Sequence, residues 1–278
     1  MRIAELLGRS RPTISFEFMA PRDETEVDVL ERTIAALAGH APDWVSVTYR
    51  LRTGDKTLEL VTRIKRQYHI EAMAHLTCAN SADKTRQILN WMEREGVANV
   101  LALRGDPQDS NERFVPAGPE LGHGSDLVAF VRGNGYGFGI GAACSTEKHP
   151  ESPDFDHEFR YMKLKVDSGA DFLVTQLFFE NRFYFDLVER ARAAGINVPI
   201  VPGLMPVPSR RSLAHMTAMS GATVPEALQL AIDEQPDDDA VRRLGVQHCI
   251  AQCAELLERG VPGLHFYTFN RARAPMEI

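Results

Sequence analysis

Residues 13–18 read TISFEF and residues 44–49 read WVSVTY, and the stretch between them has the apolar spacing of a helix over 26–38. Short β-rich runs of this kind recur along the chain, and helical patterns separate them. The predicted strands are Thr13–Phe18, Trp44–Tyr49, Glu71–Thr77, Asn99–Arg104, Phe138–Ala143, Phe172–Leu177, Pro199–Leu204 and Leu264–Phe269. Strands that alternate with helices favour a parallel sheet. About eight such units in roughly 250 residues are typical of an α/β fold of the closed (β/α)₈ (TIM) barrel type.

These units take up nearly all of the 278 residues, so we expect residues 1–278 to form a single barrel domain. A doubly wound open sheet is the alternative, and it usually carries a glycine-rich phosphate loop after its first strand. The first strand here runs into Met19-Ala20-Pro21 instead. The sequence GNGYGFGIG at 133–141 resembles a dinucleotide fingerprint, but its glycines lie before and within a predicted strand, which is typical of a tight turn.

The composition indicates a globular protein with an acidic balance. Hydrophobic residues are 44% and charged residues 25%, and 31 Lys+Arg against 38 Asp+Glu give a net charge of −7. This composition excludes a disordered or fibrous chain. The negative net charge is not typical of a protein that binds nucleic acid or an anionic membrane. Apolar runs are too short to span a bilayer or to form a secretion signal, so we expect a cytoplasmic protein. The four cysteines lack metal-ligand spacing, so no metal site is expected.

In a barrel of this type the chemistry lies at the carboxyl ends of the strands. Polar residues follow most of the predicted strands there: Glu17, Thr48, His75, Arg104–Asp106, Cys144–His149, Gln176, Tyr267, Asn270 and Arg271. We expect these side chains to converge on one pocket.

Glu17 is the most informative of these residues. It lies between Phe16 and Phe18 in a strand, so its side chain points opposite to theirs and faces the barrel interior if they pack under the helices. An unpaired buried carboxylate has a raised pKa and can act as a proton donor near neutral pH. A salt bridge to an Arg or Lys across the barrel is the alternative, and the spacing fits both.

The other strand ends are less specific. Arg104-Gly105-Asp106 could hold a phosphate or a polar heterocycle, but it could equally form an ordinary turn with an internal ion pair. His75 fits a hydrogen-bonded core histidine at least as well as a catalytic base. Gln176 offers one donor and one acceptor to a heterocycle.

Many motifs, in one order, resemble the methylenetetrahydrofolate reductase family, whose members are (β/α)₈ barrels. The motifs are Ser15–Phe18 with Pro21-Arg22, Val45–Tyr49, His75–Cys78, Ala102–Asp106, Ser125–Val128, His149–Glu151, Lys165–Asp167 with Gly169-Ala170, Thr175-Gln176 with Phe178-Phe179, Pro202-Gly203, His265–Thr268 and Asn270–Ala272. The match covers nearly the whole chain.

The resemblance implies reduction of 5,10-methylenetetrahydrofolate to 5-methyltetrahydrofolate, with NADH or NADPH as the hydride donor. In the family, the glutamate matching Glu17 is the acid that helps to open the imidazolidine ring, and the residues matching Asp106 and Gln176 hold the pterin. Tyr267 and Arg271 are the other substrate-binding candidates. The cofactor-binding candidates are Thr48, His75, Arg104, Gly105, His149 and Lys165.

The chain departs from the family on the side where most members hold FAD as a hydride relay. Tyr161 and Leu164 stand for an Asn and an Arg, and the loop 144–150 lacks the family's tyrosine. Met216 stands for a Phe that stacks on nicotinamide. One lost charge-assisted phosphate contact costs about 1.5–3 kcal/mol. We therefore expect a flavin-independent member with direct hydride transfer from NADH.

Three alternatives remain beside that expectation. One is an FAD-dependent ping-pong version of the same reaction, and another is a deazaflavin-dependent pterin reductase. The third is a non-catalytic pterin-binding barrel, against which the presence of Glu17, Asp106 and Gln176 argues.

Overall fold

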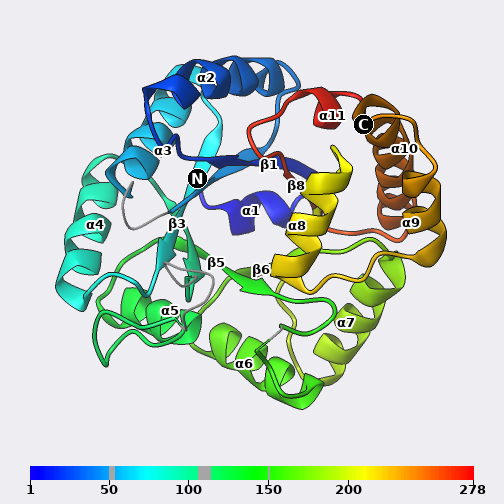
Figure 1. Ribbon diagram of the computed structural model, residues 1–278. Helices are drawn as coiled ribbons and strands as arrows, with labels where there is room; N and C mark the ends of the chain where they lie inside the picture. Colours follow the sequence, from blue (N-terminus) through cyan, green and yellow to red (C-terminus); the bar gives the residue numbers. More distant parts are fainter. Residues whose placement is uncertain (50–53, 106–113, 150) are drawn as a thin grey trace.

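The computed structural model describes residues 1–49, 54–105, 114–149 and 151–278. Within these ranges parallel strands close into a barrel, in which each strand pairs with the next and β8 pairs with β1. The strands are β1 (Thr13–Met19), β2 (Trp44–Thr48), β3 (Glu71–Thr77), β4 (Asn99–Leu103), β5 (Gly139–Cys144), β6 (Phe172–Leu177), β7 (Ile200–Leu204) and β8 (Gly263–Tyr267). Figure 1 shows helices surrounding the barrel. The predicted (β/α)₈ fold is confirmed, and the predicted strand ends differ from the observed ends by about two residues at most.

Most of the helices connect successive strands and pack on the outside of the barrel. They are α1 (Ile3–Leu7), α2 (Glu24–Ala38), α3 (Gly54–Tyr68), α4 (Ala82–Arg94), α5 (Gly124–Gly133), α6 (Phe155–Asp167), α7 (Asn181–Ala193), α8 (Arg210–Ser220), α9 (Glu226–Asp233), α10 (Asp238–Glu258) and α11 (Arg273–Met276). Several helices follow a residue whose side chain accepts a backbone N–H group of the first turn. These residues are Asp23, Ser81, Asp154, Ser209 and Asp237. Such capping stabilises a helix start by about 1 kcal/mol, so the local sequence determines where these helices begin.

The outer apolar layer fixes the direction of the β1 side chains. Phe16 and Phe18 are buried in one cluster with Leu30 and Ile34 of α2. The side chain between the two phenylalanines, Glu17, therefore points to the barrel interior, as the alternation predicts.

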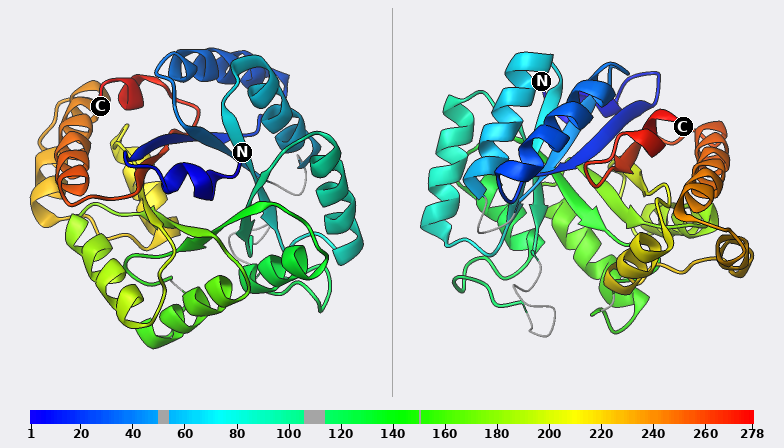
Figure 2. Two further views of the ribbon diagram at one scale, coloured as in Figure 1. Left: turned by 180° about the vertical axis from the view of Figure 1, so that it is seen from behind. Right: turned by 45° about the horizontal axis from the view of Figure 1, so that its top comes forward.

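The short helix α1 closes the end of the barrel where the strands begin. Its Ile3 and Leu6 pack in a second cluster with Trp44, Met73 and Phe172 from the strands. The backbone N–H of Ile3 also donates to the side chain of Asn99, the first residue of β4, over 2.8 Å. In the view from behind, α1 lies across the middle of the barrel (Figure 2). The opposite end, where the strands finish, is called the mouth below.

Helix α8 covers part of the mouth. Its Leu213 and Met216 pack with Leu177 at the end of β6 and with Tyr267 at the end of β8. The backbone N–H of Thr223, just after α8, donates to the carboxylate of Glu147 in the loop after β5 over 3.1 Å. The segment around α8 is thus held against two sides of the mouth.

Within the described ranges, no helix is both long and apolar enough to cross a bilayer. The same residues contain no group of His, Cys, Asp or Glu side chains that could hold a metal ion.

Candidate active site

The carboxylate of Glu17 lies between two histidines inside the mouth. Its Oε2 is 3.4 Å from Nε2 of His75 on β3 and 3.8 Å from Nε2 of His265 on β8. Ser46 of β2 places its hydroxyl 3.5 Å from the same Oε2. Glu17 pairs with Ser46 and with Tyr267 in the strand register, so barrel closure brings these residues together. We call Ser15, Glu17, Ser46, His75 and His265 the acid cluster.

The ring of His265 is held in one orientation. It stacks on Trp44 with 4.8 Å between centroids and 9° between planes. The hydroxyl of Ser15 donates to the carbonyl of Leu264 over 3.1 Å and lies 2.9 Å from Nδ1 of His265. Since that hydroxyl proton is committed to the carbonyl, Nδ1 must be the donor to Ser15. The other ring nitrogen, Nε2, faces the Ser46 hydroxyl at 3.4 Å.

These neighbours set the charge of Glu17. Burial raises its pKa, but His265, His75 and Ser46 together outweigh burial, so the pKa of Glu17 lies below its ordinary value of 4.5. Burial lowers the pKa of His75, and its ring is therefore neutral at neutral pH. The expectation of an unpaired carboxylate with a raised pKa is wrong for the free protein. Within the described ranges the charged partners of this carboxylate are histidines and not an Arg or Lys.

Two buried polar atoms in and beside the acid cluster make no hydrogen bond of good geometry in the part of the chain that the structure describes, although one of them lies near Glu17. They are Oγ1 of Thr48, at the end of β2, and Nε2 of His75. Unsatisfied buried polar groups are rare in native proteins and are commonly satisfied by a ligand or water. Both atoms belong to residues expected to contact the cofactor, and they fit a polar heterocycle bound over Glu17.

Gln176 lies near the end of β6, and Tyr267 lies at the end of β8, next to Glu17 in the strand register. The Tyr267 hydroxyl donates to the carbonyl of Thr175 over 2.6 Å, and the Oε1 of Gln176 accepts the backbone N–H of Leu177 over 2.9 Å. Tyr267 lies so close to Gly203 that a Cβ there would come within 2.6 Å of its ring. Burial, and then the charge of Glu17, raises the pKa of Tyr267, so its phenol stays protonated.

The cationic residues expected to hold a cofactor already have partners within the chain. Arg104 makes two contacts with the carboxylate of Glu151, of 2.5 and 3.0 Å. Lys165 donates to the carbonyl of Ala143 over 2.8 Å, and burial lowers the pKa of its ammonium. Nδ1 of His149 accepts the backbone N–H of Glu151 over 3.1 Å. We call Arg104, His149 and Lys165 the cofactor side of the mouth.

Helix α6 presents rings and an apolar side chain beside this cofactor side. The Tyr161 ring lies 4.7 Å from that of His157 and 5.4 Å from that of His123. Leu164 is 46% exposed although it is apolar. Neither of these two residues offers a cation to a flavin pyrophosphate.

Of the remaining expected site residues, one falls outside the described ranges and one lies away from the acid cluster. Asp106 lies outside the described residues, as do Arg50 and Arg52. Arg271 is exposed in a groove beside α8 and does not contact the acid cluster. Gly105 follows β4 with a φ of +95°, which a glycine adopts without strain, and a Cβ there would come within 3.0 Å of Thr77.

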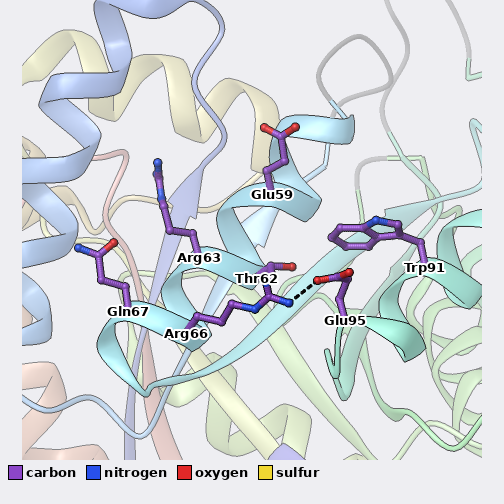
Figure 3. Close-up of a pocket in the computed structure, with 7 residues that line it drawn as sticks. All are labelled: Glu59, Thr62, Arg63, Arg66, Gln67, Trp91 and Glu95. Carbon is purple, nitrogen blue, oxygen red and sulfur yellow. Dashed lines mark hydrogen bonds and ion pairs between the residues drawn. The ribbon is translucent and has the colours of Figure 1, made fainter.

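A second groove lies between α3 and α4 (Figure 3). Arg66 in its floor forms an ion pair with Glu95, and Arg63 forms one with Glu31. These residues lie in the later turns of their helices, toward the closed end of the barrel. The groove is therefore separate from the acid cluster.

The sequence model of a family described as methylenetetrahydrofolate reductase matches residues 2–278. The chain belongs to the methylenetetrahydrofolate reductase family. It is 34% identical to the 5,10-methylenetetrahydrofolate reductases of Escherichia coli and of Pectobacterium carotovorum, and the match covers 99% of this chain and 92% and 91% of theirs. It is 33% identical to methylenetetrahydrofolate reductase (NADH) 1 of Zea mays, with 100% of this chain and 49% of that protein covered. The chain thus spans about half the length of that plant relative.

A solved structure supports the fold of this family member independently. An uncharacterized protein from Clostridium thermocellum, described as binding two copies of 5-methyl-5,6,7,8-tetrahydrofolic acid, superposes with a TM-score of 0.69 over 100% of this chain and 96% of that one. The two sequences are 15% identical, so the likeness concerns the fold alone.

Sequence reasoning missed three members of the acid cluster, Ser15, Ser46 and His265, as site residues. A signal for His265 was present in the sequence. It lies two positions before Tyr267 in the last strand, so the two side chains must point in the same inward direction. Ser46 precedes Thr48 by two positions and follows the same rule.

Proposed function

We propose that this protein reduces 5,10-methylenetetrahydrofolate to 5-methyltetrahydrofolate, with a reduced nicotinamide nucleotide as hydride donor. The observation that carries the proposal is the position of Glu17: an acidic side chain inside the mouth of a barrel of this family, with two histidines and a serine around its carboxylate. The names of the relatives, which include NADH forms, support the same reaction class.

The chemistry divides into a proton transfer and a hydride transfer. Glu17 gives a proton to N10 of the folate as the bond from N10 to the methylene carbon breaks, which leaves an N5 iminium. The nicotinamide nucleotide supplies the hydride that the iminium carbon accepts, and N5 then carries a methyl group. In total the folate takes up one proton and one hydride, and the nucleotide is oxidised. A positioned acid of this kind contributes about 10²–10⁴-fold.

Glu17 is ionised in the free protein, so it must take up a proton before it can act. A proton can pass along the contacts from Nε2 of His265 to the Ser46 hydroxyl, and that hydroxyl can donate onward to Glu17. The bound pterin also removes the remaining water from Glu17, of whose side chain 14% is exposed, and desolvation favours the neutral acid. His265 and Ser46 are thus positioning residues that supply the acid.

Direct hydride transfer without a flavin is the second part of the proposal. It is supported by Tyr161 and Leu164, which offer no cation to a pyrophosphate, and by the internal ion pair of Arg104. Thr48 and His75 keep unsatisfied polar atoms that suit the amide edge of a nicotinamide. Positioning donor and acceptor together would then supply the entropic part of catalysis.

One preparation tests both parts. The purified protein should be colourless, should oxidise NADH only when methylenetetrahydrofolate is present, and should give intersecting double-reciprocal plots. Stoichiometric flavin absorbance with parallel plots would favour the FAD-dependent alternative instead. Absence of turnover with either NADH or NADPH would contradict the reductase proposal.

A further inference from the structure

Strand β6 carries an extra residue near its carboxyl end. Val174 pairs with Val201 of β7, and two steps later in β7 the partner of Gly203 is Leu177. Two residues of β6 therefore face one residue of β7, Pro202, which makes this part of the strand a β-bulge. A proline has no N–H to donate to a neighbouring strand, and bulges beside active sites commonly redirect a side chain.

The second residue of the bulge, Gln176, has a side-chain amide that is partly exposed in the mouth. It follows Phe172 and Val174 in alternation, and those two side chains pack inside the barrel with Trp44. The Oε1 of Gln176 accepts the backbone N–H of Leu177 over 2.9 Å. Within the described ranges, the amide nitrogen donates to no protein acceptor. The nitrogen is thus the part of this side chain that is left for a ligand.

The bulge is held by its first residue, Thr175, which is fully buried. The Oγ1 of Thr175 accepts the N–H of Gly203 over 2.9 Å. Its carbonyl accepts the Tyr267 hydroxyl over 2.6 Å, although Tyr267 lies on β8, one strand beyond β7. The tyrosine thus supplies the buried carbonyl with a donor that Pro202 does not have.

Gly203 leaves the space through which Tyr267 reaches across β7. A Cβ at this position would clash with the Thr175 carbonyl and come within 2.6 Å of the Tyr267 ring. Tyr267 also pairs with Glu17 in the strand register. One hydrogen bond therefore joins the strand that carries Gln176 to the immediate neighbour of the proposed acid.

We propose that Tyr267 is a positioning residue for Gln176. Its hydroxyl holds the Thr175 carbonyl, the bulge keeps its shape, and the amide nitrogen of Gln176 stays directed at the ligand that reacts over Glu17. The inference rests on the proposed function and adds a residue to its site. The tyrosine hydroxyl acts through the chain and not by binding the substrate. Its loss matters because a small misplacement of a group that orients the substrate is costly.

Equilibrium titration with 5-methyltetrahydrofolate, without any hydride donor, compares two single variants. Tyr267→Phe removes only the hydroxyl. Thr175→Val removes the acceptor of the Gly203 N–H, on a residue too buried to touch a ligand. Both should raise Kd by about three- to tenfold, the range for one lost hydrogen bond. A rise with Tyr267→Phe alone would mean that the hydroxyl binds the ligand directly, and no rise with Tyr267→Phe would mean that the bond is idle; either result overturns the proposal.

A double-mutant cycle shows whether the effect passes through Gln176. In a Gln176→Ala background, Tyr267→Phe should change Kd by less than about twofold, because the side chain that it positions is gone. Fully additive effects of the two substitutions would contradict the proposal. In turnover assays Tyr267→Phe should raise the KM for the folate and leave the KM for NADH close to wild type.

Tyr184→Phe is the matched control. The Tyr184 hydroxyl donates to the carbonyl of Ile200 over 2.8 Å, which is the same kind of bond to a barrel strand. Ile200 is the first residue of β7, at the end of the barrel away from the mouth. The control should therefore keep the wild-type Kd. An equal rise in Kd would mean that any lost bond of this kind loosens the site, and would count against a specific role for Tyr267.

Hydrogen exchange separates this inference from the proposed function. The backbone N–H of Leu177 donates to Gln176, so its exchange reports on the bulge without any ligand. Exchange should become faster by about threefold or more in Tyr267→Phe and Thr175→Val, and stay unchanged in Tyr184→Phe. Unchanged exchange in all three variants contradicts the inference even if turnover is normal. Faster exchange in a protein that binds no folate supports the positioning role and contradicts the reductase proposal alone.

Discussion

The acid cluster and the cofactor side of the same mouth are built in different ways. Every member of the acid cluster comes from a barrel strand, and their polar atoms face one another across the interior. Arg104, His149 and Lys165 come from segments after β4 and β5 and from α6, and each is engaged by a neighbour in its own chain. The comparison teaches that the barrel strands themselves fix the geometry of the proposed acid, whereas the proposed cofactor contacts depend on loops and a helix that can change without disturbing the strands.

The largest expected effect is on the acid side. Glu17→Gln keeps the size of the side chain and its contact with Ser46 but removes the proton, so kcat should fall by about 10²–10⁴-fold. The affinity for 5-methyltetrahydrofolate should stay close to wild type. Steady-state rates and equilibrium titration measure the two quantities separately. The matched control is Glu158→Gln, which removes a buried carboxylate near the cofactor side and should lower kcat far less. Full turnover by Glu17→Gln would show that Glu17 is not the acid.

The next effect concerns the proton supply to Glu17. His265→Asn should lower kcat by about tenfold, since slow reprotonation of Glu17 would then limit each turnover. The loss should grow as the pH rises, because free protons that could replace the histidine become scarcer. A pH profile of kcat for the variant and the wild type measures this. His248→Asn is the control, because His248 packs outside the barrel with Nε2 2.9 Å from the carbonyl of Phe179. A uniform loss at every pH would indicate a purely structural role for His265.

A smaller effect is expected on the cofactor side of the mouth, where a double substitution should increase the affinity for FAD. Tyr161→Asn combined with Leu164→Arg restores the polar and cationic groups typical of the family, and each charge-assisted contact adds about 1.5–3 kcal/mol. FAD affinity should therefore rise by about tenfold or more, as measured by quenching of flavin fluorescence. Leu257→Arg places the same charge on α10 at a similarly exposed leucine and should have no effect. No gain from the double variant would mean that α6 does not decide flavin binding.

The smallest effect is on stability. Because the pKa of Glu17 lies below 4.5, its ionised form stabilises the fold above that pH, and the contribution is lost as the pH falls through the folded-state value. Glu17→Gln should lower the free energy of unfolding at neutral pH by on the order of 1 kcal/mol. The difference from wild type should shrink below about pH 4.5, as urea denaturation at several pH values can show. A variant more stable than wild type at neutral pH would mean that burial outweighs the histidines.

Local sequence patterns predicted the barrel well because each strand and helix carries its own periodicity. Helices α1 and α11 were exceptions, because five and four residues are too few to show a helical period, and the burial of α1 depends on Trp44 and Phe172 from distant strands. The inward direction of Glu17 was likewise predictable from the alternation with its two phenylalanines.

The surroundings of Glu17 could not be predicted in the same way. Ser46 lies 29 positions away and His265 far along the chain, and only closure of β8 on β1 places them beside the carboxylate. The direction of a pKa shift depends on these partners and not on burial alone, which is why the expected raised pKa was wrong. Arg271 likewise follows a strand end, but the turn after β8 directs it to the groove beside α8.

Helix α1 closes the end of the barrel where the strands begin, so ligands can enter and leave only at the mouth. With Ile3 and Leu6 packed against the strand starts, the hydride donor and acceptor of the proposed reaction would share one opening. Whichever ligand lies deeper must arrive first and depart last, so direct transfer should follow an ordered sequence of binding and release. Product-inhibition patterns would reveal which ligand that is.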